Sequence, residues 1–436
     1  MSSIDQPRAV LAWSLYDWAN SAFATVVIAG FFPIFFKQYW SDGTDPTLST
    51  ARLGLANSIA GIVVALMAPV LGAIADKGGT KKRFLLFFAY MGVVMTAGLY
   101  TVAQGDWPLA VLLYVAATVG FSGANIFYDA LLVGVASPQR IDWVSSLGFS
   151  LGYLGGGVLF ALDVWMTLSP QTFGFADAGQ AVRFAFITVA VWWALFSLPL
   201  AFWVKETGPS RPPSQALGQG LAQLRQTLAE IRHLKTIALF LAAYWLYIDG
   251  VDTIVRMAVD YGMSIGFATD DLIAALLLTQ FVGFPAAIGF GYLGNRIGAR
   301  HAIFLGLAVY LAISIWGAMI QRPSEFYALA VLIGLVQGGV QALSRSFYAR
   351  IIPPDKAAEY FGFYNMLGKF AVVIGPVLMG ATGLLIRHMG FAAETAARAG
   401  IAAVALLFVL GGTLLYFVDE EKGRQEALYL TQRTEA

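Results

Sequence analysis

Twelve long apolar segments constrain the fold of this chain more than any other feature. A helix needs about 20 apolar residues to span a bilayer. Charged residues make up about a quarter of a soluble protein but only 12% of this one. The sequence therefore predicts an all-α integral membrane protein. The expected spans are residues 9–36, 52–75, 84–103, 107–136, 143–167, 180–204, 235–259, 271–294, 300–320, 324–351, 359–386 and 394–418.

A loop that occurs twice indicates a duplicated protein. The basic, glycine-bearing stretch from Gly72 to Arg83 is followed by a similar stretch that starts at Gly291, 219 positions later in a chain of 436. Each copy stands between two membrane-length segments, and internal repeats of this kind are common in transporters. We expect twelve transmembrane helices in two pseudo-symmetric six-helix bundles, residues 1–204 and 235–436, with a short tail after Val418.

The polar segment 205–234 joins the two expected bundles. Apolar residues recur within it at helical spacing, at Leu217, Leu221, Leu224, Leu228 and Ile231. Such a stripe predicts an amphipathic helix. It would lie on the cytoplasmic face of the membrane, and the alternative is a helix that binds a partner protein.

The two loop copies differ at one acidic position. Asp76 in the first copy corresponds to Asn295 in the second, so only the first loop can offer a carboxylate to a neighbouring helix end. We expect the first loop to form a cytoplasmic latch that controls the conformational cycle. Its predicted gating residues are Gly72, Asp76, Lys77, Gly79, Lys81 and Lys82.

Loop charges predict the orientation. Lysine and arginine are enriched in cytoplasmic loops of membrane proteins. With the N-terminus placed in the cytoplasm, the inner loops hold about three times as many of these residues as the outer ones. Both termini are therefore expected in the cytoplasm, and the membrane is expected to be a bacterial inner (plasma) membrane.

Composition argues against several classes of function. A net charge of +1 gives no general attraction to nucleic acid, and no basic tract is interleaved with aromatic residues. The chain has no cysteine and three histidines, all expected in loops or at helix ends. A thiolate or histidine metal site, a catalytic triad and a bound cofactor are therefore not expected.

Ionisable residues at membrane depth are the candidate functional groups. Such residues are costly in hydrocarbon and usually face a cavity or a partner. They recur on every third expected helix, with one exception on the eleventh, which is the distribution expected if the first and fourth helices of each half line a central path. The candidate cavity residues, with three neutral polar neighbours included, are Asp17, Asn20, Asn125, Asp129, Asp249, Asp252, Arg256, Gln341, Arg345 and Lys369.

Two possible pairings follow from spacing. Asp252 and Arg256 are four residues apart and share a helix face with Asp249, so Asp252 either forms a neutralising ion pair or exchanges protons beside the arginine, while Asp249 has no obvious local partner. Asp129 and Arg345 occupy equivalent places in the two repeats. They either pair across the path or are satisfied separately by hydroxyls such as that of Tyr128. Asp17 belongs either to the cavity or to the membrane interface.

The pattern resembles the major facilitator superfamily over nearly the whole chain. Gly72, Asp76, Gly79 and Lys81 match the motif between the second and third helices of that superfamily. The stretches 16–23 and 341–346 resemble the Atg22-like branch, also called UMF1. The resemblance implies two six-helix bundles with a substrate cavity between them and alternating access. Eukaryotic relatives are associated with amino acid efflux from the vacuole.

The expected function is secondary active transport of a small polar solute, most plausibly amino acids in the export direction, coupled to protons. The partners are then the solute, H⁺ and the lipid bilayer, with the protein acting as a monomer. An exporter of lipids or amphipathic drugs is the main alternative. A membrane-embedded enzyme or a receptor is a remote one, because neither a catalytic constellation nor a large soluble region is visible in the sequence.

Overall fold

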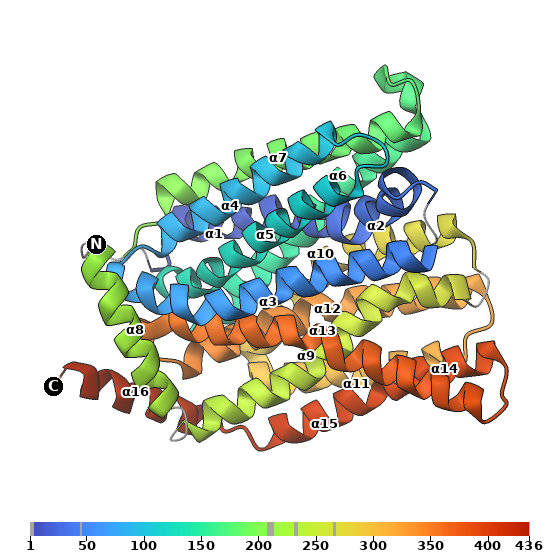
Figure 1. The fold of residues 1–436 in the computed structure, drawn as a ribbon. Helices are drawn as coiled ribbons and strands as arrows, with labels where there is room; N and C mark the ends of the chain where they lie inside the picture. Colours follow the sequence, from blue (N-terminus) through green and yellow to red (C-terminus); the bar gives the residue numbers. More distant parts are fainter. Residues whose placement is uncertain (1–3, 44–45, 207–212, 231–233, 265–266, 436) are drawn as a thin grey trace. The chain divides into compact units, whose positions relative to one another are not determined.

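The computed structural model describes residues 4–43, 46–206, 213–230, 234–264 and 267–435, and they are almost entirely helical (Figure 1). Among these residues, eleven helical stretches are long and apolar enough to cross a membrane. The 32-residue helix α13 (Ala357–His388) has the length of a twelfth. The predicted all-α membrane fold is confirmed, and twelve spans agree with the helices seen.

The first span is one helical rod with an uneven pitch. It consists of α1 (Pro7–Ala22), the π-helical segment η1 (Phe23–Phe31), the short α2 (Phe32–Phe35) and a second π-helical segment η2 (Phe36–Trp40). A π-helix closes hydrogen bonds over five residues instead of four and usually occurs as a single turn near a functional site. Nothing in the apolar pattern of residues 9–36 distinguished these stretches from an ordinary helix.

Five further helices complete the N-terminal half, and a helix follows in the linker. Asp106 and Asp177 cap α5 and α7, because their carboxylates accept the backbone N–H of the third residue that follows. The expected linker helix is present as α8, although Ile231 lies outside the described residues. The bounds are α3 (Pro46–Gly78), α4 (Lys81–Gly98), α5 (Trp107–Val135), α6 (Ile141–Leu168), α7 (Ala178–Trp203) and α8 (Pro213–Glu230).

The C-terminal half has the same succession of long helices. Its last span is divided into α14 and α15 at Val404, and α16 follows as the tail. The bounds are α9 (Lys235–Ser264), α10 (Thr269–Ile297), α11 (Ala299–Gly317), α12 (Pro323–Ile351), α13, α14 (Ala393–Ala403), α15 (Ala405–Tyr416) and α16 (Glu420–Glu435).

Contacts divide the chain into two compact units. Unit 1 comprises Met1–Ser137, Leu151–Ala222 and Ala358–Asn365, and unit 2 comprises Pro138–Ser150, Gln223–Ala357 and Met366–Ala436. The start of α6 therefore clusters with unit 2, and the start of α13 clusters with unit 1. The predicted bundles, residues 1–204 and 235–436, were defined by the sequence repeat, whereas these units are defined by contacts. The division into two bundles therefore stays a prediction.

Helices inside each unit approach closely at glycines. In unit 1, a methyl group added at Gly120 of α5 would lie 2.7 Å from the Phe88 carbonyl oxygen of α4. In unit 2, one added at Gly334 of α12 would lie 2.9 Å from the Thr279 carbonyl oxygen of α10. Small residues permit such backbone contact between membrane helices, so the paired faces are determined largely by where the glycines lie.

Candidate transport site and gating contacts

A polar seam joins the first span to α5 in unit 1. Asp17 accepts a hydrogen bond from the Tyr128 hydroxyl at 2.9 Å, and the Asn20 amide donates to Asn125 Oδ1 at 2.6 Å. The Trp13 indole donates to the Tyr128 carbonyl at 2.9 Å and stacks on its ring at 4.3 Å. The spacing of three residues on both helices aligns the two bonds. The structure thus brings together three of the predicted cavity residues.

Asp129 lies next to this seam and faces a different helix. Its Oδ2 accepts from the Asn365 amide at 3.0 Å, and its side chain is buried. The hydroxyl of Tyr128, which the sequence suggested as a local partner of Asp129, donates to Asp17. Pairing of Asp129 with Arg345 would connect the two units and stays a prediction.

Asp249 ties α9 to α13 in unit 2. Its carboxylate accepts from the backbone N–H groups of Ile374 at 3.0 Å and Gly375 at 2.9 Å, and from the Thr253 hydroxyl at 3.2 Å. A methyl group at Gly375 would lie 1.8 Å from Thr253 Oγ1, so only glycine permits this approach. The expectation that Asp249 has no obvious local partner was wrong, because the Thr253 hydroxyl, four residues further along α9, donates to it. Its two other donors are backbone N–H groups more than a hundred residues away.

Four further residues were predicted to line the cavity: Asp252, Arg256, Gln341 and Lys369. Asp252 of α9 and Gln341 of α12 are both partly exposed. The side chains of Arg256 and Lys369 lie outside the described residues. The ion pair between Asp252 and Arg256 therefore stays a prediction.

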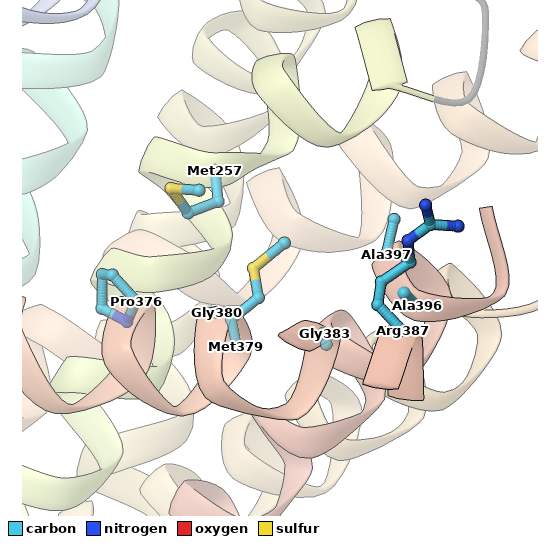
Figure 2. A pocket seen from close by; sticks show the side chains of 9 residues that line it. Met257, Pro376, Met379, Gly380, Gly383, Arg387, Ala396 and Ala397 are labelled. Carbon is cyan, nitrogen blue, oxygen red and sulfur yellow. The ribbon is translucent and has the colours of Figure 1, made fainter. Parts of the chain in front are cut away.

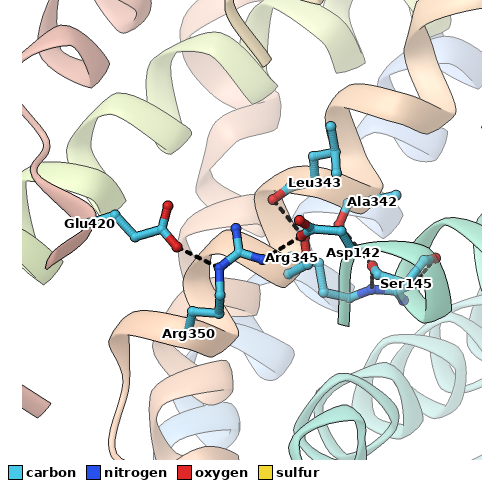
Figure 3. Close-up of polar contacts among 8 residues, drawn as sticks. Asp142, Ser145, Ala342, Leu343, Arg345, Arg350 and Glu420 are labelled. Carbon is cyan, nitrogen blue, oxygen red and sulfur yellow. Dashed lines mark hydrogen bonds and ion pairs between the residues drawn. The ribbon is translucent and has the colours of Figure 1, made fainter. Parts of the chain in front are cut away.

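Arg345 of α12 is held by the start of α6 (Figure 3). Its Nε donates to Ser145 Oγ and its Nη2 to the Ser145 carbonyl, both at 2.9 Å. The guanidinium also lies 4.4 Å from the centre of the Phe149 ring, a cation–π distance. With 3% exposure the side chain is buried, and binding of a substrate carboxylate by Arg345 would first require its release from Ser145.

An ion-pair network that sequence reasoning missed lies beside Arg345. Arg350 Nη1 contacts Asp142 Oδ1 at 2.6 Å, and Arg350 Nε contacts Glu420 at 2.6 Å (Figure 3). The Ser346 hydroxyl donates to the same Asp142 oxygen at 2.5 Å. The only sequence signal was that each charge lies at a helix end, which is also where solvated charges are common.

Asp76 caps the start of α13 in unit 1. Its carboxylate accepts from the backbone N–H groups of Ala358 at 3.1 Å and Glu359 at 2.8 Å, and it pairs with Lys81 at 2.7 Å. The Asp76 side chain is fully buried, whereas Lys81 is 18% exposed. The first N–H groups of a helix lack internal acceptors and attract negative charge, so one acid both satisfies and orients this helix end.

The glycines of the two loop copies have the same structural roles, a close helix contact and a positive φ angle. A methyl group at Gly72 would lie 2.2 Å from the Ala358 carbonyl oxygen. One at Gly291, 219 positions later, would lie 2.6 Å from Ser146 Cβ. Gly79 and Gly298, also 219 positions apart, have φ angles of +57° and +87°, which favour glycine. The duplication is therefore visible in backbone geometry as well as in residue type.

Basic residues that follow each loop hold a helix end in place. The Lys82 ammonium donates to the carbonyls of Ala201 and Val204 at 3.0 Å each, at the end of α7. In the second half, Arg300 donates to the carbonyls of Tyr416 at 3.0 Å and Val418 at 2.8 Å, at the end of α15. Cations near a helix C-terminus bind its unsatisfied carbonyls. Lys77, the last of the predicted gating residues, is half-buried.

Glu206 adds a titratable group beside the first loop. Burial raises the pKa of the Glu206 carboxyl, while the nearby backbone N–H groups and ammonium charges of Lys82 and Lys81 lower it. The net direction is upward. Glu206 follows α7 and approaches the start of α4, so the end of one span and the start of another are linked through charge.

A groove of about 340 Å³ lies among α9, α13 and α14 in unit 2. Figure 2 shows Arg387 at one end and Met257 and Pro376 at the other. The rest of its lining is formed by Met379 and small residues, and none of the predicted cavity residues contributes to it. Its chemistry suits an apolar chain with an anionic end rather than a small polar solute.

Comparison with known proteins places the chain among transporters. The model of the family described as "Vacuole effluxer Atg22 like" matches residues 5–428. The chain belongs to this family. It is 37% identical to a protein of Bacillus subtilis strain 168 described as an uncharacterized MFS-type transporter, YxiO, over 94% of both chains. Autophagy-related protein 22 of Coccidioides immitis is 22% identical, over 98% of this chain and 89% of that one.

Solved structures confirm the major facilitator fold of this Atg22-like protein. The human organic anion transporter MFSD10 matches with a TM-score of 0.71 at 17% identity, over 94% of this chain and all of that one. The proton:xylose symporter XylE matches with a TM-score of 0.69 at 13% identity, over 96% of both chains. The chain is an integral membrane transporter of the major facilitator type.

Proposed function

We propose that this Atg22-like transporter exports small polar solutes of the amino acid class by alternating access coupled to protons. The observation that carries the proposal is the polar seam of Asp17, Asn20, Asn125 and Tyr128 inside membrane-spanning helices. Polar groups at this depth are costly and usually serve a solute or ion. Amide and carboxylate groups together suit a zwitterion better than a bare ion.

Recognition of an amino acid also needs a cation for its carboxylate. Arg345 is a described cation that could serve, because its side chain is buried and Ser145, one of the groups that hold it, is neutral. A solute carboxylate would add a Coulomb attraction to Arg345 that the neutral oxygens of Ser145 do not provide.

Flux measurements test the substrate and the coupling separately. The purified protein is reconstituted into liposomes, and the transport of radiolabelled amino acids is compared with and without a pH gradient. The expected result is transport that the gradient accelerates. Equal flux in both conditions would exclude proton coupling, and no flux for any amino acid would exclude this substrate class.

Export of lipids or amphipathic drugs is a second candidate, and the groove lined by Met257, Pro376 and Arg387 favours it. An apolar tail fits its lining, while Arg387 suits an anionic head group. Flux of a fluorescent anionic lipid analogue in the same liposomes distinguishes the candidates. If the analogue moves and amino acids do not, the second candidate replaces the first.

A further inference from the structure

Asp163 of α6 is a fully buried acid that the sequence analysis passed over. Its side chain has 0% exposure. Oδ1 accepts a hydrogen bond from the Thr188 hydroxyl of α7 at 2.9 Å. Within the described part of the chain, Oδ2 is buried and has no hydrogen-bond partner. Asp163 lies within the membrane-spanning helix α6, five residues before that helix ends at Leu168.

The face of α6 that carries Asp163 packs tightly on the first span. A methyl group at Gly156 would lie 2.6 Å from Thr25 Oγ1, and one at Gly30 would lie 2.8 Å from the Phe160 ring. Thr25 and Gly30 both belong to the π-helical segment η1. π-helical turns often occur at functional sites, and a local rearrangement that exposes Asp163 would have to open this packing.

No cation neutralises Asp163 in the region that the structure describes. The charged residues on the elements packed against it, the first span and α7, are Arg8, Asp17, Lys37 and Arg183. Arg183 donates to the Tyr100 carbonyl, Arg8 and Lys37 are exposed, and Asp17 accepts from Tyr128. On α6 itself the nearest charge is Asp142, at the other end of the helix.

A buried carboxylate without a cation is strongly unfavourable. Transfer of an isolated charge into a protein interior costs several kcal/mol even after relaxation, whereas a neutral carboxylic acid costs far less. Asp163 should therefore hold a proton in the conformation described here. It can lose that proton to water only if the packing among α6, α7 and η1 opens.

We propose that Asp163 is a proton-binding site of the transport cycle. It takes a proton from water on one side of the membrane, holds it on a carboxyl oxygen while the site is closed, and returns it to water on the other side. Thr188 positions the carboxyl group through its contact with Oδ1. This inference rests on the proton coupling proposed above and assigns that coupling to a residue outside the polar seam.

Asp163→Asn is the direct test, because asparagine keeps the shape of the side chain and the acceptor for Thr188 but cannot bind the proton. Asp177→Asn is the matched control: Asp177 is exposed, and its carboxylate caps α7 through Gln180, a task that asparagine also performs. Both variants are prepared as full-length protein in lipid nanodiscs and in liposomes.

Infrared spectroscopy detects the proton without any substrate. A protonated carboxyl group has a C=O stretching band that the ionised form lacks. We expect this band to persist at neutral pH in the wild type and in Asp177→Asn, to be lost in Asp163→Asn, and to move in frequency in Asp163→Glu. A spectrum of Asp163→Asn that equals the wild-type spectrum would overturn the assignment, and Asp163→Glu provides the same test if the asparagine variant does not fold.

Transport measurements test the role of Asp163 separately from the proton coupling of the transporter. In liposomes, Asp163→Asn should lose solute accumulation driven by a pH gradient and keep exchange of labelled for unlabelled solute. If the wild-type transport rate is the same with and without the pH gradient, the proposed proton coupling is refuted, irrespective of the result for Asp163→Asn. If the wild type responds to the gradient and Asp163→Asn responds equally, the coupling stands and the role of Asp163 is refuted.

Discussion

Replacement of Asp76 by asparagine should open the contact between α3 and α13. In the wild type the buried carboxylate accepts from two backbone N–H groups, at 3.1 Å and 2.8 Å, and pairs with Lys81 at 2.7 Å. Asparagine can keep its oxygen at the Oδ1 position, which faces the Ala358 N–H and the Lys81 ammonium group, but its NH₂ group then faces the Glu359 N–H at the Oδ2 position. One hydrogen bond is thereby lost and replaced by two facing donors, and the remaining two contacts lose the negative charge that strengthens them.

The magnitude follows from these contacts. Breaking a buried ion pair by removing one partner costs about 3–5 kcal/mol, and the lower end applies because Lys81 is 18% exposed. A loss of about 3 kcal/mol changes an equilibrium roughly a hundredfold, since about 1.4 kcal/mol corresponds to a factor of ten. The fraction of molecules with the contact open should rise by about that factor.

A single cysteine can report this fraction because the chain has none of its own. Ala358 is fully buried beneath the contact, so a cysteine introduced there reacts with a maleimide only when the contact opens. We expect the labelling rate to rise by about two orders of magnitude in Asp76→Asn. Asn295→Asp is the control, since Asn295 is exposed at the corresponding position of the second half.

Two outcomes would refute this reasoning. Unchanged labelling in Asp76→Asn would mean that the carboxylate does not hold the contact closed. An equal increase in Asn295→Asp would mean that the acid at the first loop has no special role, and that the difference between the two copies is incidental.

Three further predictions concern packing and pH. Gly79→Ala should lower the free energy of unfolding by about 1–2 kcal/mol, measured by thermal denaturation, because φ is +57° there; an unchanged melting temperature would contradict the strain. Gly375→Ala should abolish transport, since its methyl group would lie 1.8 Å from Thr253 Oγ1, whereas Gly380→Ala has nothing within 4 Å and should be neutral; equal activity of the two variants would exclude a role for the close approach. Burial raises the pKa of Glu206 above its ordinary value of 4.5, so the contribution of this group to stability is present at acid pH and is lost as pH rises through the folded-state pKa. Glu206→Gln should therefore gain stability relative to the wild type as the pH is raised from acid to neutral, and a pH-independent difference in melting temperature would show that Glu206 does not titrate in this way.

The spans and the loop pair could be predicted because their causes are local in sequence. A membrane helix is recognised by its own apolar length, and the positive φ of Gly79 and Gly298 depends on a few neighbouring residues. The alignment of Asp17 with Asn20 likewise follows from helical spacing. The π-helical segments of the first span were not predicted, since residue types alone do not distinguish them from an α-helix.

The partners of the charges could not be predicted in the same way. Asp249 is satisfied by the backbone of Ile374 and Gly375, and backbone donors have no signature in side-chain identity. Asp142 and Arg350 are separated by more than two hundred residues. Asp163 was overlooked because a single acid near the end of a span resembles a residue at the membrane interface until its burial is known.

The sequence by itself determined that this chain is a duplicated membrane protein with a basic loop repeated at half-length, because hydrophobic length, loop charge and repeat spacing are properties of the chain taken segment by segment. Only the tertiary structure decided which acids are satisfied. The free energy of a carboxyl group inside a membrane protein depends on the donors and cations within hydrogen-bond distance. Helix packing brings three donors to Asp249, two donors and a lysine to Asp76, and a single hydroxyl to Asp163.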